Sequence, residues 1–182
     1  MNSEMGSDDL IIDFITGKAK ANAGAEANRQ EVERLLVETK GYQHLDIEVD
    51  APIVLKMESG IYRSTVDLVI SVNRMRFMVL KCAAGALASR EREVIAAARL
   101  MEDYQIPLAA ASDGKDAIVW NVVSGQCLGE GLDAIPTRQR MLEIFEATAL
   151  IPLEARRLLR QQLIFKSYDS MNVHRATGQP GR

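Results

Sequence analysis

The sequence predicts an α/β fold in which a mixed β-sheet is flanked by helices. Near-continuous apolar runs rich in β-branched residues, at 64–72 and 76–82, are typical of central strands covered on both faces. Segments with helical apolar spacing, at 26–41 and 89–104, precede and follow these runs. The expected order is helix, three strands, helix, two strands and two helices. Because helices and strands do not alternate regularly, a mixed sheet is favoured over a purely parallel one.

Length and composition place limits on the protein class. The chain has 182 residues, which fits one domain over 1–182, and its hydrophobic fraction of 47% is enough for a core. A net charge of -3 argues against a surface that is basic throughout, although a local basic groove is compatible with it. We find no signal sequence and no run near the ~20 apolar residues of a membrane helix. We therefore expect a cytoplasmic protein with no membrane segment, whose cysteines, Cys82 and Cys127, are buried thiols.

The first half of the chain contains the helices and strands expected to surround the site. A short helix is expected at 7–18, with Ser7 as its N-cap. A longer helix follows at 26–41. The alternating segment 44–55 predicts a strand, and Pro52 requires that this strand lie at an edge or contain a bend.

The second half begins with the helix at 89–104, for which Ser89 is the expected N-cap. Two further strands are expected, at 106–112 and 117–123. With these strands, the core of the fold covers about 26–126. A helical extension over about 137–170 then contains two helices, the first capped by Thr137.

The last expected helix carries a leucine-rich stripe. Its apolar residues at helical spacing are Leu153, Leu158, Leu159 and Leu163. We expect this stripe to pack on the core, and the alternative is a seam between the subunits of a homodimer.

Two charged residues lie inside the apolar runs of the central strands. Asp67 is in the first run and Lys81 ends the second, and burying either charge is costly unless it is paired. A two-residue turn at 73–74 would set Asp67 opposite Leu80 and place the charges on opposite faces of the sheet. A three-residue loop at 73–75 sets Asp67 opposite Lys81. We predict the second register because each charge then satisfies the other.

This pair, preceded by a helix that begins near Glu26, has the layout of a metal-dependent nuclease. Such chemistry needs carboxylates to hold Mg²⁺, whose charge stabilises the phosphate in the transition state, and a lysine that positions or activates water. We therefore predict that Asp67 and Glu26 hold Mg²⁺ and that Lys81 positions the attacking water. The alternative is that Asp67 and Lys81 form a structural ion pair and that Glu26 interacts only with the helix dipole.

Short motifs along the chain carry a resemblance to a known family. They are "EANRQ" at 26–30, "KGYQHLDIEVDAPI" at 40–53, "VDLVI" at 66–70, "VLK" at 79–81 and "ARLMEDYQIPLAAASDG" at 98–114. By the order and spacing of these motifs, the chain resembles the PD-(D/E)XK nuclease superfamily. Within that superfamily it is similar to the N-terminal domain of the type I restriction enzyme R subunit.

The resemblance implies a restriction-endonuclease-like fold and Mg²⁺-dependent hydrolysis of phosphodiesters. It places the aspartate and the lysine of the family at Asp67 and Lys81. One position departs from the pattern, because Val79 stands where the second acid of the motif belongs, two residues before the lysine. An acid from the start of the following helix, Glu91 or Glu93, could replace it.

Cationic and aromatic residues near these strands are candidates for nucleic-acid binding. Arg63 and Tyr62 precede Asp67 on its strand, where a substrate would pass. Cations of the helix at 89–104, of the last expected helix and of the segment 56–63 could together line a groove for phosphates; they are Arg90, Arg92, Arg156, Arg157, Arg160, Lys56 and Arg63. Because glutamates are interleaved with them, a solvated face of mixed charge is the alternative. DNA is the expected partner rather than RNA.

These features predict a nuclease-superfamily domain related to the type I restriction enzyme R subunit, active on phosphodiesters if the remaining site suffices. The rival hypothesis is a catalytically inactive scaffold that keeps the fold for oligomerisation or partner binding. Val79 is the feature of the sequence that favours this rival.

Overall fold

The structure, a computed structural model, describes residues 10–177, with side chains for residues 10–171. Its strands are β1 (Leu10–Ile12), β2 (Ala19–Ala21), β3 (Ile47–Met57), β4 (Gly60–Val72), β5 (Met75–Cys82), β6 (Leu108–Ser112), β7 (Ala117–Asn121) and β8 (Cys127–Glu130). Its helices are α1 (Glu26–Arg34), α2 (Glu91–Leu100), α3 (Arg138–Ala147) and α4 (Ala155–Thr177). Helix α1 continues as one π-helical segment, Leu35–Thr39.

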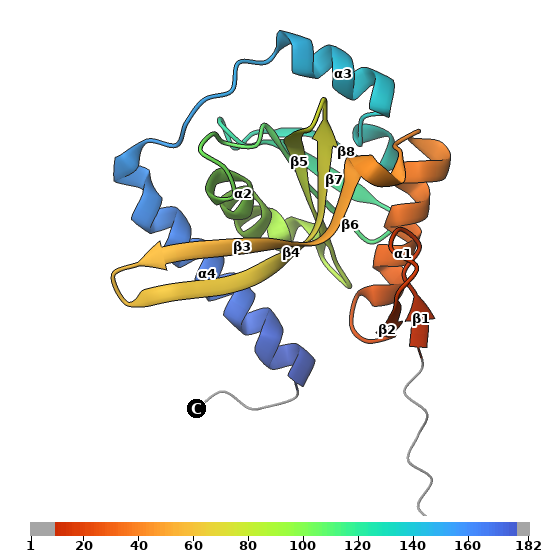
Figure 1. The fold of residues 1–182 in the computed structure, drawn as a ribbon, viewed down its shortest axis with the longest axis horizontal. Helices are drawn as coiled ribbons and strands as arrows, with labels where there is room; N and C mark the ends of the chain where they lie inside the picture. Colours follow the sequence, from red (N-terminus) through yellow and green to blue (C-terminus); the bar gives the residue numbers. More distant parts are fainter. Residues whose placement is uncertain (1–9, 178–182) are drawn as a thin grey trace, which may run out of the picture.

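The strands form a six-stranded sheet in the order β3-β4-β5-β6-β7-β8, and β1 and β2 form a separate hairpin (Figure 1). Strands β5 and β6 are parallel, whereas the other neighbouring strands of the large sheet are antiparallel. The crossover between β5 and β6 contains α2, as a parallel connection requires. The predicted mixed sheet flanked by helices is therefore confirmed.

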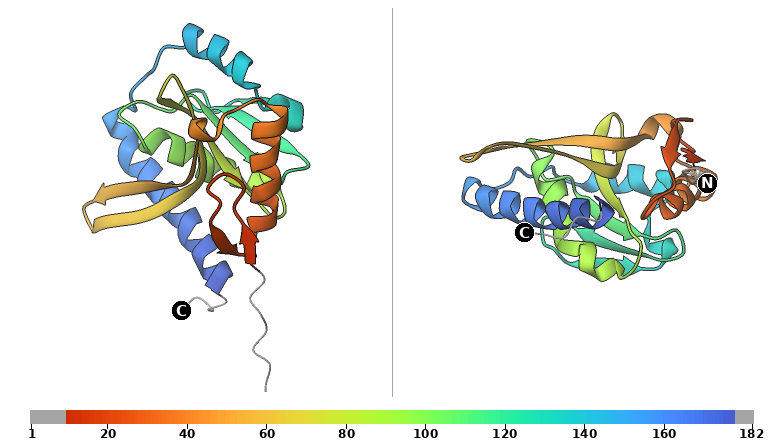
Figure 2. Two further views of the ribbon diagram at one scale, coloured as in Figure 1. Left: turned by 45° about the vertical axis from the view of Figure 1, so that its right-hand side comes forward. Right: turned by 90° about the horizontal axis from the view of Figure 1, so that it is seen from below.

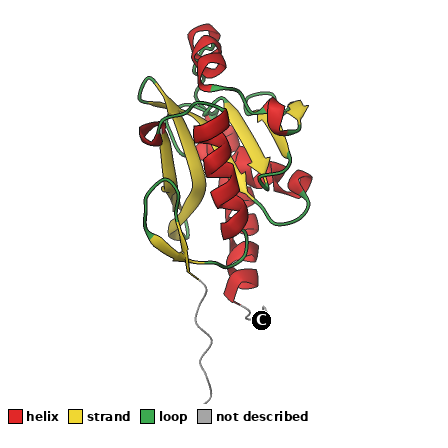
Figure 3. Ribbon diagram, turned by 90° about the vertical axis from the view of Figure 1, so that its right-hand side faces the viewer, coloured by secondary structure: helices red, strands yellow, loops and turns green. Residues whose placement is uncertain are grey.

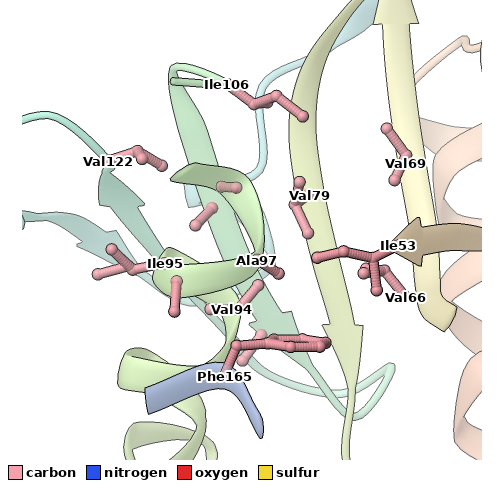
Figure 4. Close-up of a cluster of buried hydrophobic side chains, with 14 of the residues drawn as sticks. Ile53, Val66, Val69, Val79, Val94, Ile95, Ala97, Ile106, Val122 and Phe165 are labelled. Carbon is pink, nitrogen blue, oxygen red and sulfur yellow. The ribbon is translucent and has the colours of Figure 1, made fainter. Parts of the chain in front are cut away.

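Helices cover both faces of this sheet. One buried cluster joins the sheet to α2 and α4 through residues such as Val69, Val94 and Phe165 (Figure 4). The other cluster joins it to α1 and α3 through residues such as Val32 and Met141. Figure 3, seen from the side of α1, shows this helix in front of the strands. The central strands are thus apolar on both faces, as their sequence predicts.

The β3–β4 hairpin extends beyond the rest of the sheet as a long arm. Seen from below, the arm lies alongside α4 (Figure 2). The hydroxyl of Tyr62 donates a hydrogen bond to Asp169 at 2.6 Å, and the amide of Gln162 donates one to the carbonyl of Lys56 at 3.1 Å. These contacts attach the arm to the C-terminal helix.

The β4–β5 hairpin reaches the predicted register by a different route. The turn has two residues, Asn73 and Arg74, both in the left-handed region, so the expected three-residue loop is wrong. A bulge then leaves Phe77 unpaired, because Ser71 pairs with Arg76 but Ile70 pairs with Met78. The extra residue shifts the register by one. The last regular pair is Leu68 with Leu80, so the next position on each strand is Asp67 and Lys81.

The bulge residue has a clear packing role. Phe77 is fully buried, and its ring meets that of Phe145 in α3 edge to face, with centroids 5.4 Å apart. Edge-to-face aromatic pairs add stabilisation beyond the area that they bury. This contact favours the bulged strand over a regular one.

The N-terminal segment differs from its expectation. The described part of 7–18 forms β1 and a tight turn instead of a helix, and Ser7 lies outside the described residues. The carboxylate of Asp13 accepts hydrogen bonds from the backbone and hydroxyl of Thr16, and Gly17 adopts a positive φ of 69°. Such local side-chain bonds compete with helix formation.

One of the expected helix caps is confirmed and one is wrong. Thr137 accepts a hydrogen bond from the backbone N–H of Arg140 at 3.2 Å and caps α3. The chain forms a short 3-10 turn before α2, so Ser89 does not cap the helix. Its hydroxyl instead donates to the carbonyl of Ala86 at 2.7 Å.

Two further differences concern surface residues. Strand β8 was not predicted, and it leaves Cys127 exposed, whereas Cys82 is buried as expected. Helix α4 packs through Gln161 and Phe165, so the expectation that its leucines pack on the core is wrong for the exposed Leu158, Leu159 and Leu163. The homodimer seam remains a prediction. No helix in the described part of the chain is long and apolar enough to cross a membrane.

Arg74→Gly is expected to stabilise the protein. Arg74 has a φ of 65° in the β4–β5 turn, a conformation that glycine adopts without steric cost. We expect the free energy of unfolding in urea to rise by about 0.5–1 kcal/mol. Arg63→Gly, at an exposed strand position, is the matched control and should lower it. A loss of stability in Arg74→Gly equal to that of the control would contradict the turn geometry.

Candidate functional site

Asp67 and Lys81 meet on the face of the sheet that α2 covers. The ammonium of Lys81 lies 3.3 Å from one carboxylate oxygen of Asp67 and 3.4 Å from a carboxylate oxygen of Glu93 in α2. The other oxygen of Asp67 accepts a hydrogen bond from the backbone N–H of Cys82 at 2.7 Å. The predicted pairing of the two charges is confirmed.

The strands separate where this pair lies. The β4–β5 pairing ends at Leu68 and Leu80, whereas β5 continues beside β6 as far as Cys82. The carboxylate of Asp67 accepts a hydrogen bond from the N–H of Cys82, so this backbone donor keeps a partner where β4 separates from β5. On the other side of β4, Asp50 of β3 is opposite Asp67 and has a φ of 51°, which bends the arm away.

A cavity of about 480 Å³ opens at this divergence. Four residues predicted from the sequence line it together: Glu26, Asp67, Lys81 and Arg90. Three acidic side chains line the cavity (Glu26, Asp50 and Asp67), and three cationic side chains balance them (Arg29, Lys81 and Arg90). The charged side chains of the cavity therefore balance, and its net charge is close to zero.

The surroundings of Lys81 keep it protonated. Burial alone would lower the pKa of its ammonium, but the charges of Asp67 and Glu93 and hydrogen bonds to both raise that pKa above its ordinary value. An amine that holds its proton so firmly cannot accept one from water near neutral pH. Lys81 can orient a water molecule or a phosphate as a cation, and it is not suited to act as a general base.

Glu26 is held by its own helix. Its carboxylate lies 2.6 Å from the guanidinium of Arg29 and accepts a hydrogen bond from the amide of Gln30 at 2.8 Å. The side chain of Asn28 ties the same helix to the loop after β5, by a 2.8 Å bond to the carbonyl of Ala83. The helix thus brings Glu26 to the cavity with its carboxylate already paired.

Arg29 is the centre of a larger charge network. Its buried guanidinium lies within 4 Å of four carboxylates, those of Asp13, Glu26, Glu33 and Asp50. Lys20 of β2 also contacts Asp13 and Asp50. This network joins the N-terminal hairpin, α1 and the bend of β3, so it fixes one wall of the cavity.

The excess of acid in this network alters the proton affinity of Glu33. Burial, followed by the charge of Asp13, raises the pKa of Glu33 to about 7, against the opposing charge of Arg29. Glu33 therefore binds a proton more readily than an exposed glutamate does, because its ionised form adds one more negative charge to a buried cluster.

Neither Val79 nor Glu93 supplies an acid to the cavity; the acid that lines it beside Glu26 and Asp67 is Asp50. Val79 is fully buried in the cluster beneath α2, among Val69, Val94 and Ile106 (Figure 4). Glu93 contacts Lys81 but does not line the cavity. The ammonium of Lys81 therefore separates Glu93 from the cavity, and Glu93 positions the lysine.

The donor set does not fit a magnesium ion in this arrangement. Among the residues that the structure describes, no group of three or more Asp, Glu, His or Cys side chains is placed to hold a metal. The two expected ligands, Asp67 and Glu26, are engaged by Lys81 and Arg29. Mg²⁺ needs oxygen ligands that are open to it, and here cations occupy their place.

Tyr62 and Arg63 lie away from the cavity. Both are on the β3–β4 arm, beyond the bend, and neither lines the cavity. Tyr62 is held against α4 by its bond to Asp169, whereas Arg63 is exposed. Their predicted contact with nucleic acid would therefore be made by the arm.

Two important site residues were missed by the sequence reasoning. Arg29 lies in the "EANRQ" motif, so its place beside Glu26 could have been suspected. Asp50 occupies one of the polar positions of the alternating segment 44–55, so the sequence pattern does not indicate that it belongs to a site. Its role depends on the strand register, which sets it opposite Asp67.

Glu33→Gln is expected to change how stability depends on pH. Because the folded-state pKa of about 7 lies above the ordinary 4.5, the unfolded chain releases this proton first as pH rises, and the folded state loses stability over that interval. Relative to Glu33→Gln, the wild type should lose on the order of 2 kcal/mol of unfolding free energy between about pH 5 and about pH 8.

Urea unfolding of the two proteins across this pH range measures the difference. Glu143→Gln, at a side chain exposed on α3, is the matched control and should follow the wild-type profile. Parallel profiles for the wild type and Glu33→Gln would show that Glu33 does not titrate in this range.

The sequence was compared with protein families, and both sequence and structure with known proteins. No curated protein and no solved structure gave a significant match. The family described as the type I restriction enzyme R protein N terminus matches residues 24–136. The matched segment begins just before α1 and includes the strands that carry Asp67 and Lys81, and it covers more than half of the chain. The chain therefore belongs to the type I restriction enzyme R protein N-terminal family.

Proposed function

We propose that this chain is a DNA-binding domain in which the nuclease-like centre is closed by ion pairs and does not hydrolyse phosphodiesters. The observation that carries this proposal is the state of Asp67, whose two carboxylate oxygens are engaged by Lys81 and by the N–H of Cys82. Membership of a restriction-enzyme family supports DNA, rather than RNA, as the partner. The proposed place of action is the cytoplasm.

Several features of the cavity support binding without hydrolysis. Val79 offers no ligand, and Glu93 faces Lys81 and not the cavity. The raised pKa of Lys81 leaves an ammonium that can contact a phosphate oxygen but cannot remove a proton from water. Arg29 and Arg90 line the same cavity as further cations. These groups are suited to holding a phosphate more than to cleaving its ester.

A second candidate function is Mg²⁺-dependent phosphodiester hydrolysis, with Asp67 and Glu26 as ligands and Lys81 positioning water. The specific observation in its favour is that these three side chains line one cavity. This function would require Asp67 and Glu26 to be released from their cationic partners. The closed arrangement is the better supported of the two, because both carboxylates are engaged at once.

An assay with labelled duplex DNA separates the two functions. We expect the purified chain to bind DNA in EDTA and to leave it intact in Mg²⁺ or Mn²⁺, because no open ligand set is present among the described residues. Asp67→Ala and Lys81→Ala are assayed in parallel. Cleavage by the wild type that both variants lose would overturn the closed-site proposal and establish the second candidate. Absence of DNA binding would refute the proposed function itself.

A further inference from the structure

A second hollow lies between α2 and α4, apart from the candidate site. Its volume is about 460 Å³. Five arginines line it, together with the side chains of Ile95 and Ile164. We call this surface the arginine groove; its arginines are Arg92, Arg99, Arg156, Arg157 and Arg160.

The charge of the groove is not balanced locally. Glu91 is the acidic residue among the lining side chains, against five arginines. Within the described part of the chain, Arg156 forms an ion pair with Glu154. The other four arginines of the groove form no ion pair with a carboxylate of the described residues. The candidate-site cavity, by contrast, has as many acids as cations. In a chain whose net charge is -3, this is a marked local excess of positive charge.

The groove is built from two helical faces that are held in place. The guanidinium of Arg99 donates to the carbonyl of Val122 at 2.6 Å and to the side chain of Gln161 at 3.3 Å, which links α2 to the end of β7 and to α4. Burial, followed by the nearby charge of Arg157, lowers the pKa of Arg99. The two cations therefore repel each other in a site that a bound anion would stabilise.

The spacing of the arginines suits a ligand with repeated negative charge. Arg92 and Arg99 are seven residues apart on α2, which corresponds to about 10 Å along a helix. This is longer than one phosphate group. Duplex DNA, in comparison, carries one negative charge per about 1.7 Å of its axis. Guanidinium groups also bind phosphate oxygens in pairs, with defined geometry.

We propose that the arginine groove binds the phosphate backbone of DNA, an inference that rests on the proposed function and locates its contact surface. The groove depends on α4, which begins at Ala155 and lies outside the family match of 24–136. The C-terminal helix thus completes a binding surface that the family core does not contain alone.

The groove and the candidate site flank the same end of α2. Arg90, just before the helix, lines the cavity, and Arg92, in its first turn, lines the groove. A backbone held in the groove can therefore continue past the start of α2 toward Lys81.

The test measures DNA affinity against salt in EDTA, so that cleavage plays no part. The groove variant is Arg157→Gln with Arg160→Gln, both on α4. The matched control, Lys115→Gln with Arg140→Gln, removes the same charge from exposed positions outside the groove. Fluorescence anisotropy with a labelled duplex gives the dissociation constant, and circular dichroism checks that each variant folds.

We expect the groove variant to bind at least about tenfold more weakly than the control. The slope of the logarithm of affinity against the logarithm of salt concentration should become shallower by about 1.8, because each phosphate that the variant no longer neutralises contributes about 0.9. Equal affinities and slopes in the two variants, with the wild type still bound to DNA, would overturn the groove and leave the proposed function intact.

Two further outcomes identify other ligands. If the wild type does not bind DNA, the proposed function and the groove both fail. If inorganic pyrophosphate binds to the wild type and not to the groove variant while DNA binds to neither, the groove takes a free polyphosphate, and the proposal of a DNA backbone is wrong. Isothermal titration calorimetry of pyrophosphate into the wild type and the groove variant distinguishes these cases.

Discussion

The ammonium of Lys81 lies between the carboxylates of Asp67 and Glu93, at the point where β4 leaves β5. Three charges from two strands and a helix can be sheltered there only because each has a partner of opposite sign. The same contact stabilises the end of the β4–β5 ladder, where the carboxylate of Asp67 takes the N–H of Cys82. It also places a permanent positive charge on the wall of the cavity. The contact between Asp67 and Lys81 therefore bears both on the separation of β4 from β5 and on the charge of the cavity.

Much of the fold could be predicted, because apolar periodicity directly reports which faces are buried. The sequence reasoning found α1, α2 and five of the six strands of the large sheet, β3 to β7, to within a few residues. The turn was predicted wrongly although its register was right, since the bulge at Phe77 depends on Phe145, a residue 68 positions later. The N-terminal hairpin was missed for a similar reason. Its Asp13 is held by Arg29 and Lys20 as well as by its own turn.

The site was predicted in part. Asp67 and Lys81 could be found because charges are conspicuous inside apolar strands, and Glu26 and Arg90 do line the same cavity. The partners that decide their chemistry were harder to foresee. Arg29 engages Glu26, and Glu93 fixes Lys81, through contacts set by helix packing and not by any local pattern. Four arginines of the groove were anticipated, as one of two interpretations, whereas Arg99 was not, and the expected Arg90 lines the other cavity. The sequence does not show which glutamates accompany the arginines in space. The structure leaves Glu91 as the acid that lines the arginine groove.

The coupling between Asp67 and Lys81 is the quantity that tests this account most directly. A double-mutant cycle with Asp67→Asn, Lys81→Met and the double variant, followed by urea unfolding, isolates it. If the ion pair stabilises the point where β4 and β5 separate, the effects of the two substitutions should be non-additive by about 1–3 kcal/mol. The double variant should then lose less unfolding free energy than the two single variants lose in sum. Additivity within about 0.3 kcal/mol would mean that the charges do not stabilise each other, and the closed site would lose its physical basis.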